Sequence, residues 1–170
     1  MTPLPAILDK GSRLVAWRID EKRHAATWDR GEGSFRNGGR WNSPGRRIVY
    51  CSFDPAVTIL EVAVHKTFEV LDMVPHVLTS IEVLPSAYDK VFIVRPEDLP
   101  NKYWLLSSTS SKGQRDFGDQ LLATHPFVVI PSVPAASSWN VLFDSTVVKR
   151  MYNLLGQEEF GLDTRLHPIR

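Results

Sequence analysis

The sequence predicts a single α+β domain spanning residues 1–170. Short apolar runs rich in β-branched residues recur along the chain and are bounded by turn residues, a pattern typical of strands. Two stretches show the spacing of amphipathic helices instead. The length of 170 residues suits one domain with its own hydrophobic core. Residues 1–10, which include Pro3 and Pro5, are expected to form a flexible N-terminal extension.

The first predicted strand is Leu14–Trp17, and Arg47–Ser52 forms the second. Residues 20–46 between them are polar, rich in Gly and Arg, and without period. A loop of this length in a compact domain is usually either a functional site or disordered. We therefore expect residues 20–46 to carry function.

A helix is predicted to begin at Asp54-Pro55, with Asp54 as the N-cap and Pro55 at the first helical position. Helical spacing predicts that its buried stripe consists of Ala56, Ile59, Leu60, Ala63 and Val64. Glu61 falls on the flank of that stripe, which would put its carboxylate at the rim of whatever the helix packs against.

The second half of the chain predicts four strands, a helical turn and a helix. The strands are His76–Val83, Val91–Val94, Phe127–Ile130 and a last one at Glu159–Leu166, the turn is Pro96–Leu99, and the helix is Gly113–Thr124.

Composition excludes several classes of protein. The apolar fraction of 43% and the charged fraction of 23% are those of a soluble globular protein. A net charge of +1 argues against direct nucleic-acid binding through bulk electrostatics. Cys51 is the only cysteine and the five His show no ligand spacing, so we predict neither a disulfide nor a metal site. Without a signal peptide or a membrane-length apolar run, we expect a cytoplasmic protein with no membrane contact.

The segment Asn37–Gly45 has the composition of a ligand-binding loop. Its glycines allow close approach of the backbone to a ligand, Arg40 offers a fork of donors for phosphate or carboxylate, and Trp41 can stack on a ring or anchor the loop. Lys and Arg outnumber Asp and Glu in the first fifty residues, which suits a discrete anionic ligand. A solvated basic face is the alternative for most of these arginines.

Four features in order resemble the RES-domain family. They are Trp17-Arg18, the Gly-Gly-Arg-Trp-Asn loop with Tyr50 after it, Glu61 on its helix, and Pro131-Ser132 followed by Trp139-Asn140. The ending Asp163-Thr164-Arg165-Leu166 is also similar to that family's. The resemblance implies a strand core like that of the ADP-ribosyltransferases and a toxin that consumes NAD, with an Xre-type helix-turn-helix antitoxin as its partner.

Residue by residue, the resemblance implies that Arg40, Glu61 and Ser132 are catalytic. Arg18, Tyr50 and Asn140 would bind substrate. NAD would be a substrate and not a resident cofactor, in agreement with the lack of a Gly-x-Gly-x-x-Gly turn after a strand. Inorganic phosphate is the expected co-substrate.

The chemistry of NAD cleavage needs few groups. Breaking the nicotinamide–ribose bond passes through an oxocarbenium-like state, which a carboxylate such as Glu61 can stabilise. Arginines would hold pyrophosphate or an attacking phosphate, Tyr50 could stack on nicotinamide, and Ser132 or Asn140 could bind the carboxamide or ribose.

Two other functions remain open from the sequence. The first is transfer of ADP-ribose to a protein, which often uses a second carboxylate; the next acid, Glu69, lies too far along the helix to share the face of Glu61 reliably. The second is a non-catalytic module that binds an anionic ligand or nucleic acid through the N-terminal arginines, which would give strongly salt-dependent binding.

Overall fold

A computed structural model of the chain describes residues 13–106, 110–161 and 163. The expected N-terminal extension at 1–10 and residues 164–166 of the family-like ending lie outside the described residues. Within the described part, no helix is long and apolar enough to span a membrane.

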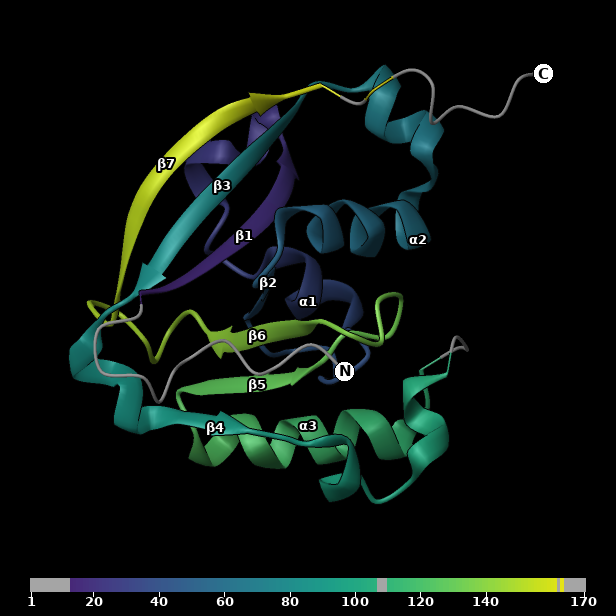
Figure 1. The fold of residues 1–170 in the computed structure, drawn as a ribbon, viewed down its shortest axis with the longest axis vertical. Coiled ribbons are helices and arrows are strands. Elements are labelled where there is room, and N and C mark those ends of the chain that lie inside the picture. The colour runs from purple at the N-terminus through teal and green to yellow at the C-terminus, as the bar shows by residue number, and fades with distance from the viewer. Residues whose placement is uncertain (1–12, 107–109, 162, 164–170) are drawn as a thin grey trace.

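One seven-stranded sheet organises the fold, with the strand order β4-β5-β6-β2-β1-β3-β7 (Figure 1). Neighbouring strands are antiparallel, except that β4 and β5 are parallel. The strands are β1 Leu14–Glu21, β2 Ile48–Ser52, β3 His76–Val83, β4 Val91–Ile93, β5 Phe127–Pro131, β6 Trp139–Asp144 and β7 Tyr152–Phe160. The α+β prediction is confirmed.

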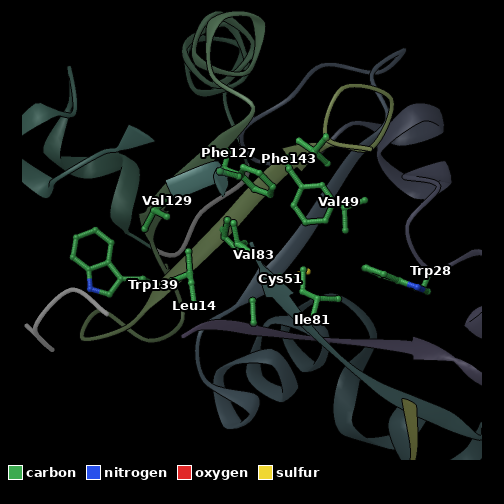
Figure 2. Close-up of a cluster of buried hydrophobic side chains, with 14 residues drawn as sticks. Leu14, Trp28, Val49, Cys51, Ile81, Val83, Phe127, Val129, Trp139 and Phe143 are labelled. Carbon is green, nitrogen blue, oxygen red and sulfur yellow. The ribbon is translucent and has the colours of Figure 1, made fainter. Parts of the chain in front are cut away.

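The sheet bends where β2 meets β1. These two strands share a single register pair, Trp17 with Ser52, whereas β1 and β3 pair along their whole length. A buried core cluster takes residues from both sides of this junction, among them Leu14, Val49, Ile81 and Phe143 (Figure 2). Because burying apolar surface is the main favourable term in folding, this shared core holds the two halves of the sheet together.

Two longer helices cover the outer faces. Helix α2 (Pro55–Met73) packs on β1 around Ile19 and Leu71, and α3 (Lys112–Thr124) lies along the β4–β5–β6 side (Figure 1). The shorter helices are η1 Lys22–Thr27, α1 Glu32–Asn37, η2 Pro85–Lys90, η3 Pro96–Asp98 and η4 Lys102–Leu105. A capping box between Ser111 and Gln114 begins α3.

Two sequence predictions about elements were wrong, and one strand was not predicted. Residues 20–46 are not all loop, because η1 and α1 lie within them; α1 buries no residue and so has no apolar stripe to detect. The last strand is Tyr152–Phe160, so it ends where the predicted Glu159–Leu166 strand was to begin. Strand β6 was not predicted, and Asn140 lies inside it.

The predicted buried stripe of α2 was right only in part. Ile59 and Ala63 pack against the cluster of Ile19 and Leu71, whereas Ala56 is exposed. Leu60 and Val64 are 38% and 62% exposed, and Val57 and Thr58 are buried in their place. Thr58 donates its hydroxyl to the Trp17 carbonyl at 3.1 Å, which compensates its burial. The inner face of α2 therefore carries polar residues beside apolar ones, among them Glu61, and apolar periodicity misplaces part of the stripe.

Candidate active site

A cluster of four polar side chains lies where α2 passes the ends of β2, β5 and β6. Ser132 donates its hydroxyl to Oε1 of Glu61 at 2.8 Å, and Asn140 donates Nδ2 to the same oxygen at 2.5 Å. Ser52 donates its hydroxyl to Oδ1 of Asn140 at 2.6 Å. Each of these three bonds joins residues 71 to 88 positions apart in the chain, so only the tertiary fold brings the partners together.

Strand geometry explains why these side chains meet. Ser52 ends β2 and pairs directly with Asn140 on β6, while Asn140 pairs with Ile130 on β5. Directly paired residues share a face of a sheet, and residues two apart on a strand also share it. Ser132, two residues beyond Ile130, therefore falls on the same face as Asn140 and Ser52. Ser132 and Asn140 are 1% and 8% exposed, so their hydrogen bonds to Glu61 are sheltered from water.

The backbone after β5 fixes Ser132. Its N–H donates to the Ser138 carbonyl at 2.9 Å, and the Ala135 N–H donates to its Oγ at 3.3 Å. The hydroxyl accepts one bond within the loop and donates the other to Glu61, so its rotamer is determined from both sides.

Arg40 is a positive charge near enough to Glu61 for the two charges to interact. It is half-buried, and burial lowers its pKa, while the negative charge of Glu61 acts in the opposite direction. An Arg remains protonated despite such a shift. Arg40 is thus a charged group in a partly dehydrated site, where its interaction with the charge of Glu61 is stronger than it would be in water.

The loop that carries Arg40 is held by Tyr50. The Tyr50 hydroxyl donates to Oδ1 of Asn42 at 2.7 Å and accepts the Trp41 N–H at 3.2 Å. Burial raises the pKa of Tyr50 well above its ordinary value, so the hydroxyl keeps its proton and can donate. A Cβ at Gly39 would lie 2.5 Å from that hydroxyl, and the loop could not pass Tyr50 with any larger residue there.

Helix α3 holds the same loop from the other side. The Asp119 carboxylate accepts the Ser43 N–H at 3.2 Å, and Arg46 donates to the Asp119 carbonyl at 2.6 Å. Trp41 packs edge-on against Trp104 and Phe117, with ring centroids 6.3 and 6.4 Å away. Of the two uses proposed for Trp41, anchoring the loop is therefore the one seen in the structure.

Replacing Tyr50 by Phe should destabilise the protein through the loop. The variant leaves Oδ1 of Asn42, a fully buried residue, without this donor. We expect the free energy of unfolding in urea to fall by about 1–3 kcal/mol. Tyr103→Phe is the matched control. Tyr103 is 61% exposed, so removing its hydroxyl should change the free energy of unfolding little. Equal midpoints for the two variants would contradict the anchoring role.

Arg18 does not join the cluster. It donates Nε and Nη2 to Asp20 at 2.8 and 2.7 Å, and Nη1 to the Tyr50 carbonyl at 3.0 Å. Since Trp17 pairs with Ser52, alternation turns Arg18 to the opposite face of the sheet, where its charge acts on the buried Cys51. Its role in substrate binding stays a prediction, and its observed contact with the site is through the backbone of Tyr50.

A cavity of about 720 Å³ adjoins the cluster without containing it. Trp17, Phe53 and Val57 line one part, and residues 135–139 line another. Val57 lies one turn before Glu61 on α2, and Ala135 bonds Ser132. None of the six predicted site residues lines this cavity, so the hydrogen-bonded geometry, and not the cavity, defines the candidate site.

Sequence reasoning missed three residues that shape the site. Ser52 and Asp119 act through contacts far apart in the sequence, and a lone Ser at a strand end or Asp on a helix gives no signal. Asn42 stands in the Gly-Gly-Arg-Trp-Asn loop, and its complete burial is the reason that position needs an amide. In the part of the chain that the structure describes, no three His, Cys, Asp or Glu side chains gather as a metal site would require.

The fold is thus a seven-stranded α+β domain in which a carboxylate, an amide and two hydroxyls gather at the ends of β2, β5 and β6. The RES domain profile matches residues 15–160, and the chain belongs to the RES domain family. The match includes the loop of Arg40, Glu61 on α2, and the strands that carry Ser132 and Asn140.

Similar proteins support this membership. A protein called Toxin Res from Photorhabdus laumondii is 24% identical over 156 residues, covering 90% of this chain and 97% of the relative. Toxin Res from Pseudomonas putida is 27% identical over 154 residues, covering 90% and 99%. A chain of the M. tuberculosis MbcT–MbcA toxin–antitoxin complex has the same fold, with a TM-score of 0.61, 19% identity, and coverage of 88% of this chain and 85% of that one.

Proposed function

We propose that this protein is the toxin of a toxin–antitoxin pair and degrades NAD by cleaving the nicotinamide–ribose bond, with inorganic phosphate as the acceptor. The observation that carries the proposal is the Glu61 carboxylate, which accepts hydrogen bonds from Ser132 and Asn140. The charge of Arg40 interacts with it. Relatives named Toxin Res along nine-tenths of the chain support the toxin assignment.

The proposed reaction requires one well-placed negative charge. As the bond from the anomeric carbon to the pyridinium nitrogen breaks, its electron pair goes to the ring and nicotinamide leaves as a neutral molecule, so no general acid is needed. Positive charge grows on the ribose, where Glu61 would stabilise it. A phosphate oxygen then forms the new bond to the anomeric carbon, and ADP-ribose-1″-phosphate is the second product. Arg40 would bind the attacking phosphate or the pyrophosphate.

The proposed partner is an Xre-type helix-turn-helix antitoxin. The solved complex with the same fold pairs a toxin with an antitoxin, and the resemblance to the RES family favours an Xre-type protein for this chain. An enzyme that consumes NAD without control would deplete the cell that makes it, so inhibition by a bound antitoxin suits the proposed activity.

The test is product analysis of the purified protein incubated with NAD, with and without inorganic phosphate. We expect nicotinamide release that depends on phosphate, together with ADP-ribose-1″-phosphate. Release without phosphate, with ADP-ribose as product, would replace the phosphorylase by a hydrolase. Failure to release nicotinamide under either condition would contradict NAD degradation. If cell extract is added and one of its proteins becomes linked to ADP-ribose, the result would favour transfer of ADP-ribose to a protein.

A further inference from the structure

Ser52 is a buried member of the cluster that bonds Asn140 and does not bond Glu61 itself. It ends β2, is 3% exposed, and stands directly opposite Asn140 in the pairing of β2 with β6. Its hydroxyl donates to Oδ1 of Asn140 at 2.6 Å, and Asn140 in turn donates Nδ2 to Glu61. Ser52 therefore lies one hydrogen bond behind the group that contacts the carboxylate.

The bond from Ser52 determines which way the Asn140 carboxamide points. A carboxamide has an accepting oxygen on one side and donating hydrogens on the other. With Ser52 donating to the oxygen, the NH2 side is turned to Glu61. Without that donor, the side-chain carbonyl of Asn140, which is 8% exposed, would lose its hydrogen-bond partner. If the carboxamide then rotated by half a turn, its oxygen would lie against the Glu61 carboxylate. A hydroxyl at position 52 thus favours the orientation that stabilises the carboxylate.

The orientation has a consequence for the carboxylate itself. Ser132 and Asn140 both donate to Oε1 of Glu61, and among the described residues the hydrogen bonds to this carboxylate all reach Oε1. Two donors on one oxygen hold the carboxylate plane and leave Oε2 as the oxygen available to a reacting group. This selection depends on Asn140 keeping its NH2 side toward Glu61.

We infer that Ser52 is a positioning residue, which fixes the Asn140 carboxamide so that Glu61 presents Oε2 to the substrate. The identity of that substrate as NAD rests on the proposed function, whereas the Ser52–Asn140–Glu61 relay rests on the hydrogen bonds of the site. Ser52 itself need not touch the substrate.

Ser80 provides a matched control. Trp17 on β1 pairs with Ser52 on one side and with Ser80 on the other, so the two serines lie in the same row across the sheet. The Ser80 hydroxyl donates to the Gly156 carbonyl at 3.5 Å, far along the chain from the cluster. Ser80→Ala removes the same atom from the same row and leaves the Asn140 carboxamide unaffected.

The kinetic test compares Ser52→Ala, Ser80→Ala, Asn140→Ala and the double variant S52A/N140A in NAD cleavage. We expect Ser52→Ala to lower kcat about tenfold or more while KM changes by less than about threefold, because an interaction needed in the transition state is lost. Ser80→Ala should match the parent protein. In the Asn140→Ala background, Ser52→Ala should change kcat by less than about twofold, because residues that act as one unit are not additive. Equal effects of Ser52→Ala in both backgrounds would overturn the relay.

Ser52→Cys replaces the hydroxyl by a weak donor without leaving a cavity and protects the test against a variant that does not fold. We expect the same selective loss of kcat, with a thermal midpoint close to that of the parent protein. A parent-like kcat for Ser52→Cys would overturn the requirement for a strong donor at this position.

A second readout separates this inference from the proposed function. The ¹⁵N NMR signals of the Asn140 side-chain NH2, assigned by their loss in Asn140→Ala, should shift and exchange faster with water in Ser52→Ala but not in Ser80→Ala. If the parent protein leaves NAD untouched, the proposed function fails, and these signals still decide whether Ser52 orients Asn140. Unchanged signals in Ser52→Ala would overturn the inference even if NAD cleavage is observed.

Discussion

Glu61→Gln should abolish NAD cleavage while the protein stays folded. A Gln keeps an accepting oxygen for Ser132 and Asn140 at the position of Oε1, so the hydrogen-bonded cluster can form with little change of volume. The negative charge that would oppose growing positive charge on the ribose is removed. Because removing a single donor from such a site already costs about 10²–10³-fold in kcat, we expect a loss of about 10³-fold or more.

The measurement is nicotinamide release by purified Glu61→Gln, next to growth of cells that express it without an antitoxin. The parent protein should arrest growth and Glu61→Gln should not. Glu158→Gln is the control, because Glu158 is exposed on β7 and the same change there should leave both readouts unaltered. Cleavage by Glu61→Gln within about threefold of the parent rate would rule out the carboxylate as the stabilising charge.

The elements that the sequence predicted well are those whose burial follows a simple period. Strand β3 was predicted with both ends correct, because β-branched and apolar residues recur along it between turn residues. The Asp54-Pro55 signal marked the start of α2, where the Asp54 side chain accepts the Ala56 N–H at 2.8 Å. Local rules suffice in these places because the local preference and the tertiary structure agree.

The prediction of buried residues failed on the part of α2 that contributes to the candidate site. The predicted stripe of α2 wrongly included Leu60 and Val64, because the side facing the strands also carries the polar residues Thr58 and Glu61. Polar residues on an inner face are tolerated only when tertiary hydrogen bonds satisfy them, and periodicity does not contain those bonds. The conflict between the helical pattern and the observed packing is itself a mark of a functional face.

The sequence analysis named several residues of the candidate site but few of the hydrogen bonds that join them. Glu61, Ser132 and Asn140 were named from the resemblance, and the structure brings them within hydrogen-bond distance. The bond of Tyr50 to Asn42 and that of Ser52 to Asn140 could not be anticipated, because each depends on strand register and loop path. Registers arise from long-range pairing, which no local pattern of the sequence specifies.

Gly118→Ala should damage the site from a position that no substrate touches. An ideal Cβ at Gly118 would lie 2.0 Å from the carbonyl oxygen of Trp41 and 2.7 Å from its carbonyl carbon. Ala is favoured over Gly inside a helix by about 1 kcal/mol, but overpacking costs about 1–3 kcal/mol and occasionally more. The steric effect should win, because the atoms in the way belong to backbone and not to a side chain that can turn aside.

The expected result is a lower free energy of unfolding together with a loss of NAD cleavage on the order of 10²-fold, since Arg40 precedes Trp41 and must move with it. Gly33→Ala is the counterpart in α1, where an added Cβ meets no atom within 4 Å, and it should leave stability unchanged or raise it by about 0.4–1 kcal/mol. Urea unfolding and nicotinamide release on both variants decide the point. If Gly118→Ala proved as stable and as active as Gly33→Ala, the packing of α3 would not determine the position of the Arg40 loop relative to Glu61. A selective loss in Gly118→Ala would instead mean that the position of Arg40 is set by the packing of a helix against its loop.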